Sequence, residues 1–220
     1  MKTFAILLLA GSSTRFSSDT KKQFFLLNNE PVYQYSLELF EKSKLIDGIV
    51  LVANESDIPS LKEETKNYKK IVSIVKGGAY RQESVKNGLD AIKDEGRVLI
   101  HDSARPLIDE EIISNLLSAL DEYDGATPTI QVIDTIVKVN EDKIIASFED
   151  RNKLYRVQTP QAFKLSIVKE AHKKFAGENA TDDTTLLCKL GKKVKIVEGK
   201  EKYRKITKLE DIKALEEFIK

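Results

Sequence analysis

The 220-residue sequence has few of the residues that build disulfide or metal frameworks: one cysteine and two histidines. Cys188 cannot form an internal disulfide, and it has neither a Cys-x-x-Cys partner nor metal-ligand neighbours. A disulfide scaffold and a cysteine-based metal module are therefore excluded. Because Cys188 stands in the apolar-spaced segment TTLLCKL, we interpret it as a core residue of a cytoplasmic protein.

The sequence also lacks an excess of charge and a long apolar run. Its 36 basic and 35 acidic residues leave a net charge of +1, and no dense basic patch is present, so neither nucleic acid nor a membrane surface is a predicted partner. The apolar run FAILLLA is too short to span a bilayer and predicts a buried strand. With no repeat or Pro/Gly-rich linker, residues 1–220 are predicted to form one domain.

Short β-branched segments alternate with segments of helical apolar spacing along most of the chain. This alternation predicts an α/β, Rossmann-like fold with a mostly parallel sheet and helices on both faces. A fold of this kind binds its ligand outside the carboxyl ends of the strands. The expected strands are residues 4–10, 48–53, 71–77, 97–102, 126–137 and 193–199, and the expected helices are residues 31–43, 83–95, 109–123, 164–176 and 208–220.

Residues 134–159 interrupt this alternation with a pattern of strand, turn, strand, turn, strand, in which NEDK (residues 140–143) is the first turn. We interpret the segment as a β-arm that leaves the body of the domain. Because an isolated hairpin is marginally stable in water, the arm needs a partner surface. A second copy of the chain in a symmetric homodimer would supply it.

The loop after the first strand, LAGSSTRFSSDTKKQF, has the composition of an anion-binding loop. Gly11 permits close backbone approach, while Arg15 and Lys22 add full charges, so a polyphosphate is the expected guest. Neither GxxxxGK[ST] nor GxGxxG is present, which argues against a P-loop NTPase and a nicotinamide dehydrogenase. Lysine pairs recur elsewhere on predicted solvated faces, so only its position after a strand selects Lys22, and Lys21 has no assigned role.

Two further polar clusters follow other predicted strands and should meet this loop at the same sheet edge. In GGAYRQESVKNGL, the turn at Gly78 and Ala79 and the hydroxyl of Ser84 suit a flat base and its ribose, although a plain tight turn would have the same sequence. In HDSARP, Asp102 suits a divalent cation, although a lone Asp at a strand end is often a helix cap or turn former.

These motifs, together with DRNKLYRVQTPQAF, TDDTT and EGKEKYRKIT, occur in an order and spacing that resemble the 2-C-methyl-D-erythritol 4-phosphate cytidylyltransferase family of the non-mevalonate isoprenoid pathway. The resemblance implies a homodimeric enzyme that uses Mg²⁺ to transfer CMP from CTP to the sugar-alcohol phosphate, releasing pyrophosphate. It extends to the cytidylyltransferase half of fused synthase enzymes. Three positions depart from the family pattern: Lys21, where proline is usual, Ser103, where alanine is usual, and the pair Tyr203-Arg204.

The residues and the resemblance together define a candidate site for direct attack of the substrate phosphate on the α-phosphate of CTP. We expect Arg15, Lys22 and Lys205 to be catalytic, Asp102 to bind the metal, Ala10, Gly11, Ser12, Ser13, Gly78, Ala79, Ser84, Asp102 and Ser103 to bind the nucleotide, and Arg105, Thr135, Arg151 and Thr159 to bind the sugar phosphate.

Two alternatives to this function stay open at the level of sequence: a ribitol-5-phosphate cytidylyltransferase and a non-catalytic nucleotide-binding module. Asp182 and Asp183 either order the site or cap a helix. Neither histidine is expected to be catalytic, since this mechanism gives His101 no proton to move and His172 fits a solvated or half-buried structural role on a helix.

Overall fold

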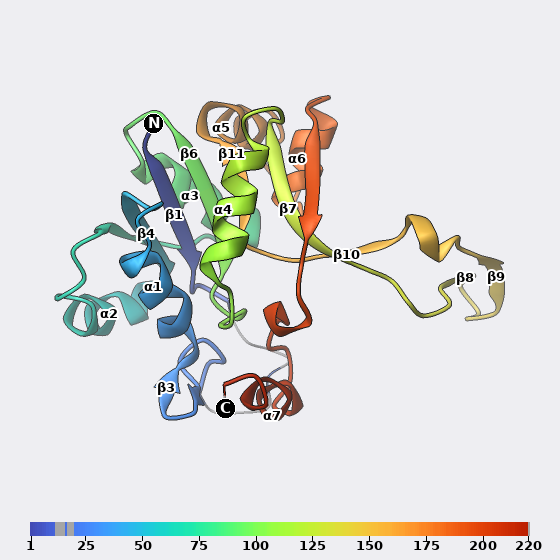
Figure 1. Ribbon diagram of the computed structural model, residues 1–220, viewed down its shortest axis with the longest axis horizontal. Coiled ribbons are helices and arrows are strands. Elements are labelled where there is room, and N and C mark those ends of the chain that lie inside the picture. Colours follow the sequence, from blue (N-terminus) through green and yellow to red (C-terminus); the bar gives the residue numbers. More distant parts are fainter. Residues whose placement is uncertain (12–15, 17–19, 220) are drawn as a thin grey trace.

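The computed structural model describes residues 1–11, 16 and 20–219 (Figure 1). Within them, eight strands form one mixed sheet in the order β10-β7-β11-β6-β1-β4-β5, with β12 paired to the other side of β7. The central pairs β6-β1, β1-β4 and β4-β5 are parallel. The strands are β1 (Thr3–Leu8), β4 (Gly48–Ala53), β5 (Ile71–Lys76), β6 (Arg97–Asp102), β7 (Gly125–Gln131), β10 (Tyr155–Val157), β11 (Gln161–Lys164) and β12 (Val194–Glu198).

Helices cover both faces of this sheet, which confirms the predicted α/β class. Side chains alternate along a strand, so Ala5 and Leu7 of β1 pack in one core while Phe4 and Ile6 pack in the other. One face carries α1 (Val32–Lys42), α2 (Ile58–Glu64) and α4 (Glu110–Ala119), and the other carries α3 (Arg81–Ala91), α5 (Leu165–Lys174) and α6 (Asp183–Lys189).

Two details of the predicted sheet were wrong. The strand expected over residues 126–137 ends at Gln131, where the chain leaves the body. The short strand β11 was missed, and it lies antiparallel between β6 and β7, so the sheet is mixed at this end. Four residues are too few to show a period, and β11 leads directly into α5, whose helical spacing dominates the sequence pattern there.

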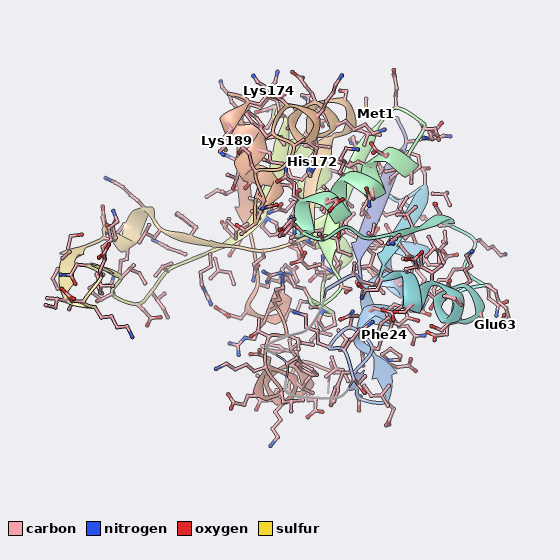
Figure 2. All side chains as sticks on the ribbon, turned by 180° about the vertical axis from the view of Figure 1, so that it is seen from behind. Met1, Phe24, Glu63, His172, Lys174 and Lys189 are labelled. Carbon is pink, nitrogen blue, oxygen red and sulfur yellow. The ribbon has the colours of Figure 1, made fainter. Side chains whose placement is uncertain are left out.

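The predicted arm projects from the body as a hairpin of β8 (Val137–Val139) and β9 (Ile145–Phe148), joined by the expected turn at residues 140–143 (Figure 1). The 3-10 helix η2 (Arg151–Lys153) forms the second turn. The third strand, β10, does not stay in the arm, because it pairs with β7 in the main sheet. The side chains of the β8–β9 hairpin lie clear of the body (Figure 2). The large apolar side chains exposed in or next to this hairpin are Ile133, Val139, Ile144, Ile145 and Phe148.

A third, smaller core joins the C-terminal segment to residues that follow β1. Phe16, Leu27 and Val32 pack with Ile206, Ile212 and Leu215, all of which are buried. This contact returns the chain end to the carboxyl edge of the sheet, next to β6. The elements involved are β2 (Leu26–Leu27), β3 (Glu30–Pro31), the 3-10 helix η3 (Glu201–Tyr203) and α7 (Glu210–Glu216).

Cys188 is exposed, so its interpretation as a core residue was wrong. Leu186 and Leu187 are fully buried in α6. Because each helical residue turns by about 100°, the next residue passes beyond the buried face. In a helix of seven residues the apolar spacing was too short to fix this phase.

We predict that Cys188→Ser changes the free energy of unfolding by less than about 0.5 kcal/mol, because it removes no buried contact. The neighbouring control Leu187→Ala should cost about 2–5 kcal/mol, since it opens a cavity. Chemical denaturation measures both changes. In parallel, a thiol reagent should label native Cys188 without denaturant; labelling that requires unfolding would contradict the exposed position.

Candidate active site

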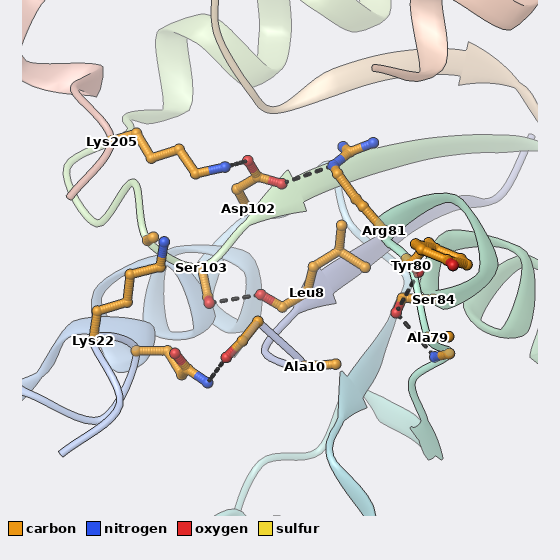
Figure 3. Close-up of a pocket in the computed structure, with 14 residues that line it drawn as sticks. Leu8, Ala10, Lys22, Ala79, Tyr80, Arg81, Ser84, Asp102, Ser103 and Lys205 are labelled. Carbon is orange, nitrogen blue, oxygen red and sulfur yellow. Dashed lines mark hydrogen bonds and ion pairs between the residues drawn. The ribbon is translucent and has the colours of Figure 1, made fainter. Parts of the chain in front are cut away.

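A cavity of about 280 Å³ lies at the carboxyl ends of β1, β5 and β6 (Figure 3). It brings together three polar clusters that are far apart in the sequence, as the strand-end argument predicted. The lining residues are Leu8, Ala10, Gly11, Lys22, Gln23, Gly78, Ala79, Tyr80, Arg81, Ser84, Asp102, Ser103, Ala104 and Lys205. Of the other expected residues of the loop, Ser12, Ser13 and Arg15 lie outside the described residues.

The Asp102 carboxylate lies between two cationic side chains, which approach it from opposite sides (Figure 3). Arg81 Nε donates to Oδ1 at 3.2 Å, and Lys205 Nζ donates to Oδ2. Burial alone would raise the pKa of Asp102, but the charges of Arg81 and Lys205 outweigh it and hold the pKa well below its usual range. Asp102 is therefore an ionised carboxylate at neutral pH.

Arg81 connects Asp102 to a second buried carboxylate. Its Nη1 atom donates to Asp183 Oδ2 at 2.7 Å, and Asp183 Oδ1 lies 2.9 Å from His172 Nε2. Burial lowers the pKa of Arg81, but the two carboxylates raise it further than burial lowers it. The four side chains come from β6, α3, α6 and α5, so this network ties four elements together.

The sequence left open whether Asp182 and Asp183 of the TDDTT segment order the site or cap a helix, and the structure gives the two residues different contacts. Asp182 caps α6, accepting a hydrogen bond from Thr184 N at 2.9 Å, whereas Asp183 is buried and paired with Arg81. His172 is almost fully buried, so its expected solvated or half-buried position was wrong. Arg81 was missed, although it lies three residues after Gly78 and begins α3.

The turn after β5 is closed by its own side chains. Ser84 Oγ accepts from Gly78 N at 3.0 Å, and Glu83 accepts from Ala79 N at 2.7 Å. A Cβ atom added to Gly77 would lie 2.4 Å from Ala10 Cβ, so the absence of a side chain lets this turn pack against Ala10, two residues after the end of β1. Ser84, expected to touch the nucleotide, thus also shapes the turn.

The carboxyl end of β6 is held by a chain of neutral hydrogen bonds. The Asp102 amide donates to Thr159 Oγ1 at 3.1 Å, and that hydroxyl lies 3.0 Å from His101 Nδ1. His101 Nε2 donates to the Arg105 carbonyl at 3.0 Å, since a carbonyl only accepts. Burial lowers the pKa of His101 to about 3, so the ring is neutral at pH 7.

The four residues expected to bind the sugar phosphate fall into two places. The buried Thr159 hydroxyl accepts from the Asp102 amide, and the Arg105 guanidinium donates to the Tyr203 carbonyl at 2.8 Å. Thr135 and Arg151 are exposed on the arm, where Arg151 donates to the Ile133 carbonyl at 2.7 Å. A single copy of the chain does not bring these two arm residues to the lining of the cavity.

A family model described as 2-C-methyl-D-erythritol 4-phosphate cytidylyltransferase matches residues 3–220. The chain belongs to this family. Two curated relatives with that name come from Clostridium acetobutylicum, 41% identical over 98% of this chain and 96% of the relative, and from Geobacter metallireducens, 40% identical over 100% and 98%. The resemblance read from the motifs is confirmed.

Solved structures of the cytidylyltransferase family share the fold. The 4-diphosphocytidyl-2C-methyl-D-erythritol synthase from Anaerococcus prevotii matches with a TM-score of 0.86 and 28% identity, over 99% of this chain and 98% of that one. The bifunctional IspDF from Campylobacter jejuni matches with a TM-score of 0.85 and 35% identity, over 98% of this chain. This chain spans 54% of that bifunctional protein.

The cytidylyltransferase cavity offers few protein ligands for a metal. Among the residues that the structure describes, no group of three or more His, Cys, Asp or Glu side chains is placed to hold an ion.

Across the same residues, no helix has the length and apolarity needed to cross a membrane.

The bridging role of Arg81 predicts a stability effect that depends on pH in a defined direction. In the wild type the folded-state pKa values of Asp102 and Asp183 are lowered, so their contribution is complete above about pH 4 and is lost as pH falls below it. Arg81→Met leaves two buried carboxylates underpaired, and we expect a loss of about 2–4 kcal/mol at pH 7. Protonation of these underpaired carboxylates removes their buried charge in the variant. The loss should therefore shrink as pH falls from 7 to 4.

Denaturation curves across this pH range measure the difference between wild type and variant. Lys86→Met is the matched control, since Lys86 pairs with Asp90 on the exposed face of the same helix and should cost less than about 0.5 kcal/mol at every pH. A loss for Arg81→Met that stays constant or grows toward pH 4 would contradict the bridge.

Proposed function

We propose that this chain transfers CMP from CTP to 2-C-methyl-D-erythritol 4-phosphate, giving 4-diphosphocytidyl-2-C-methyl-D-erythritol and pyrophosphate. Membership of the cytidylyltransferase family over residues 3–220 carries the proposal. The cavity supports it, because Lys22 and Lys205 line it together with the turn at Gly78 and with Asp102. Residues 1–220 act as one domain in this proposal, and a cytoplasmic location stays a prediction of the sequence.

The proposed reaction is a direct displacement. An oxygen of the substrate phosphate attacks the α-phosphorus of CTP, and the bond to the β-phosphate oxygen breaks on the opposite side. The attacking oxygen is already anionic, so no general base is needed. The paired Asp102 and the neutral His101 are consistent with this, since neither is poised to exchange a proton near pH 7.

The main task of the protein is then to bring two polyanions together and stabilise the charge that develops at the α-phosphate. We assign this charge stabilisation to Lys22 and Lys205, which line the cavity, and to Arg15 of the same loop as Lys22. The expected nucleotide contacts at Ala10, Gly11, Gly78, Ala79, Ser84 and Ser103 also lie in that lining.

Nucleotidyltransferases generally depend on a divalent cation, and we propose Mg²⁺ here. One protein carboxylate fits this ion, because Mg²⁺ usually takes one or two carboxylates and completes its shell with phosphate oxygens and water. Asp102 would hold it, sharing its oxygens with Arg81 and Lys205. When bound, the ion would neutralise triphosphate charge.

We further propose that the active enzyme is a homodimer in which each arm completes the site of the other copy. The exposed apolar side chains of the arm, including Ile145 and Phe148, support a protein partner for it. Thr135 and Arg151 would then bind the sugar phosphate held near the partner copy's Lys22.

A pyrophosphate-release assay tests the function. Turnover should require both CTP and 2-C-methyl-D-erythritol 4-phosphate, and ATP or GTP should be poor donors, since the close-packed turn at Gly78 leaves little room for a purine. Preferred turnover of ribitol 5-phosphate would instead identify the sister activity. CTP binding without turnover of either acceptor would identify a non-catalytic module.

Subunit mixing tests the arm. Lys22→Ala should lower kcat by about 10²–10³-fold, as expected for loss of a group that stabilises transition-state charge, and Arg151→Ala should also be nearly inactive. After random exchange of the two variants, half of the dimers are mixed and each has one intact site if Arg151 acts across the interface. Roughly a quarter of wild-type activity should therefore return.

Exchange is followed independently with differently tagged copies. The matched control mixes Lys22→Ala with Lys205→Ala, and both of these variants keep an intact arm. Because both residues line the cavity of one chain, each site of a mixed dimer lacks one of them, and no activity should return. If exchange is complete and the Arg151 mixture stays inactive, the arm acts on its own copy or not at this site.

A further inference from the structure

Three consecutive residues at the end of the loop after β1 have three different environments. Lys21 Nζ donates to both carboxylate oxygens of Asp57, at 2.7 and 2.6 Å. Lys22 lines the cavity (Figure 3). The Gln23 side chain is buried and donates to the Leu9 carbonyl at 2.6 Å and to the Gly11 carbonyl at 3.2 Å. The residue that enters the cavity is thus flanked by two that are bound to the body.

Asp57, the partner of Lys21, is itself held in place by its neighbours. It ends the 3-10 helix η1 (Glu55–Asp57), which follows β4, and it stands at the N-cap of α2 without capping it through its side chain. Its carboxylate also accepts from Asn54 Nδ2 at 3.2 Å. Burial raises the pKa of Asp57, but its hydrogen bonds to Lys21 and Asn54 lower it below the usual value.

The backbone between these ties is closed into a turn. The Lys21 carbonyl accepts from Phe24 N at 2.9 Å and from Phe25 N at 3.1 Å, and the Gln23 carbonyl accepts from Tyr33 N at 3.0 Å. A movement of Lys21 would therefore change the direction in which its neighbour Lys22 leaves the backbone. The Lys21 contact with Asp57 and the Gln23 contacts with the Leu9 and Gly11 carbonyls therefore restrain the turn on both sides of Lys22 in the sequence.

We propose that the Lys21–Asp57 ion pair positions Lys22 for the transfer reaction, which makes Lys21 and Asp57 positioning residues. The inference rests on the proposed function, in which Lys22 stabilises the transition state. The pair is partly exposed, with side-chain exposures of 35% and 15%, so its contribution to global stability is small. Positioning is a stricter requirement, because a displacement of about 1 Å near the reacting atoms can cost up to 10²-fold in rate.

A second role for Lys21 gives the opposite result for one variant. If the Lys21 charge simply attracted CTP, removing Lys21 would weaken binding, whereas removing Asp57 would strengthen it by leaving the positive charge uncompensated. If the pair acts by positioning, both removals misplace Lys22 and both lower kcat. Lys21→Ala and Asp57→Ala together therefore separate charge attraction from positioning.

We expect each single variant to lower kcat about 5- to 30-fold, with the KM for CTP within about twofold and the Tm within about 2 °C of wild type. Lys21→Arg, which keeps the pair, should retain at least half of the activity, and the reversed pair Lys21→Asp/Asp57→Lys should recover much of what Lys21→Asp alone loses. The matched control is Glu55→Ala, since Glu55 lies on the same 3-10 helix but pairs with Lys76 at 2.5 Å.

The decisive measurement is a double-mutant cycle with Lys22→Ala, using the wild-type pyrophosphate-release activity as its reference. If Lys21 acts through Lys22, Lys21→Ala should cause no further loss in the Lys22→Ala background. Equal losses in both backgrounds, a rise in activity for Asp57→Ala, or a loss below twofold for Lys21→Ala would each overturn the positioning role. A wild-type chain that releases no pyrophosphate would instead refute the proposed function itself.

Discussion

The buried carboxylate of Asp102 and the two cations bound to it are the interaction on which the candidate site depends. An ionised carboxylate is costly to bury unless it is paired and hydrogen-bonded. The Asp102 carboxylate meets this condition with groups from separate elements: Arg81 from the start of α3 and Lys205 from the C-terminal segment. The charge at the end of β6 therefore selects which segments converge there.

The sheet explains why this convergence occurs at one edge. Leu8 of β1 pairs with Val52 of β4 and with Asp102 of β6, so the parallel strands end at nearly the same level. The loop of Lys22 and the turn of Gly78 then begin side by side, and neither requires a long excursion. The buried apolar residues fix the strand ends, and the strand ends fix the positions of the polar groups.

The sequence predicted those features that depend on local pattern. Apolar runs located the central strands, and residues at or just beyond their carboxyl ends, such as Asp102 and Gly11, line the cavity as expected. Pairings over long separations could not be predicted, because nothing local links Arg81 to Asp183, 102 residues away. The outward position of Cys188 was missed for a different reason, since one or two helical turns do not fix which side of a helix is buried.

The ionisation states around Asp102 also bear on the kind of reaction that this cavity suits. The lowered pKa of Asp102 keeps it charged, while burial keeps His101 neutral with a pKa of about 3, so neither changes its charge near pH 7. A phosphate monoester, by contrast, loses its second proton with a pKa of about 6. In the proposed reaction the nucleophile therefore arrives already activated by its own ionisation. The protein has only to hold fixed charges in place, and a network of buried, mutually paired ions does this without having to move a proton.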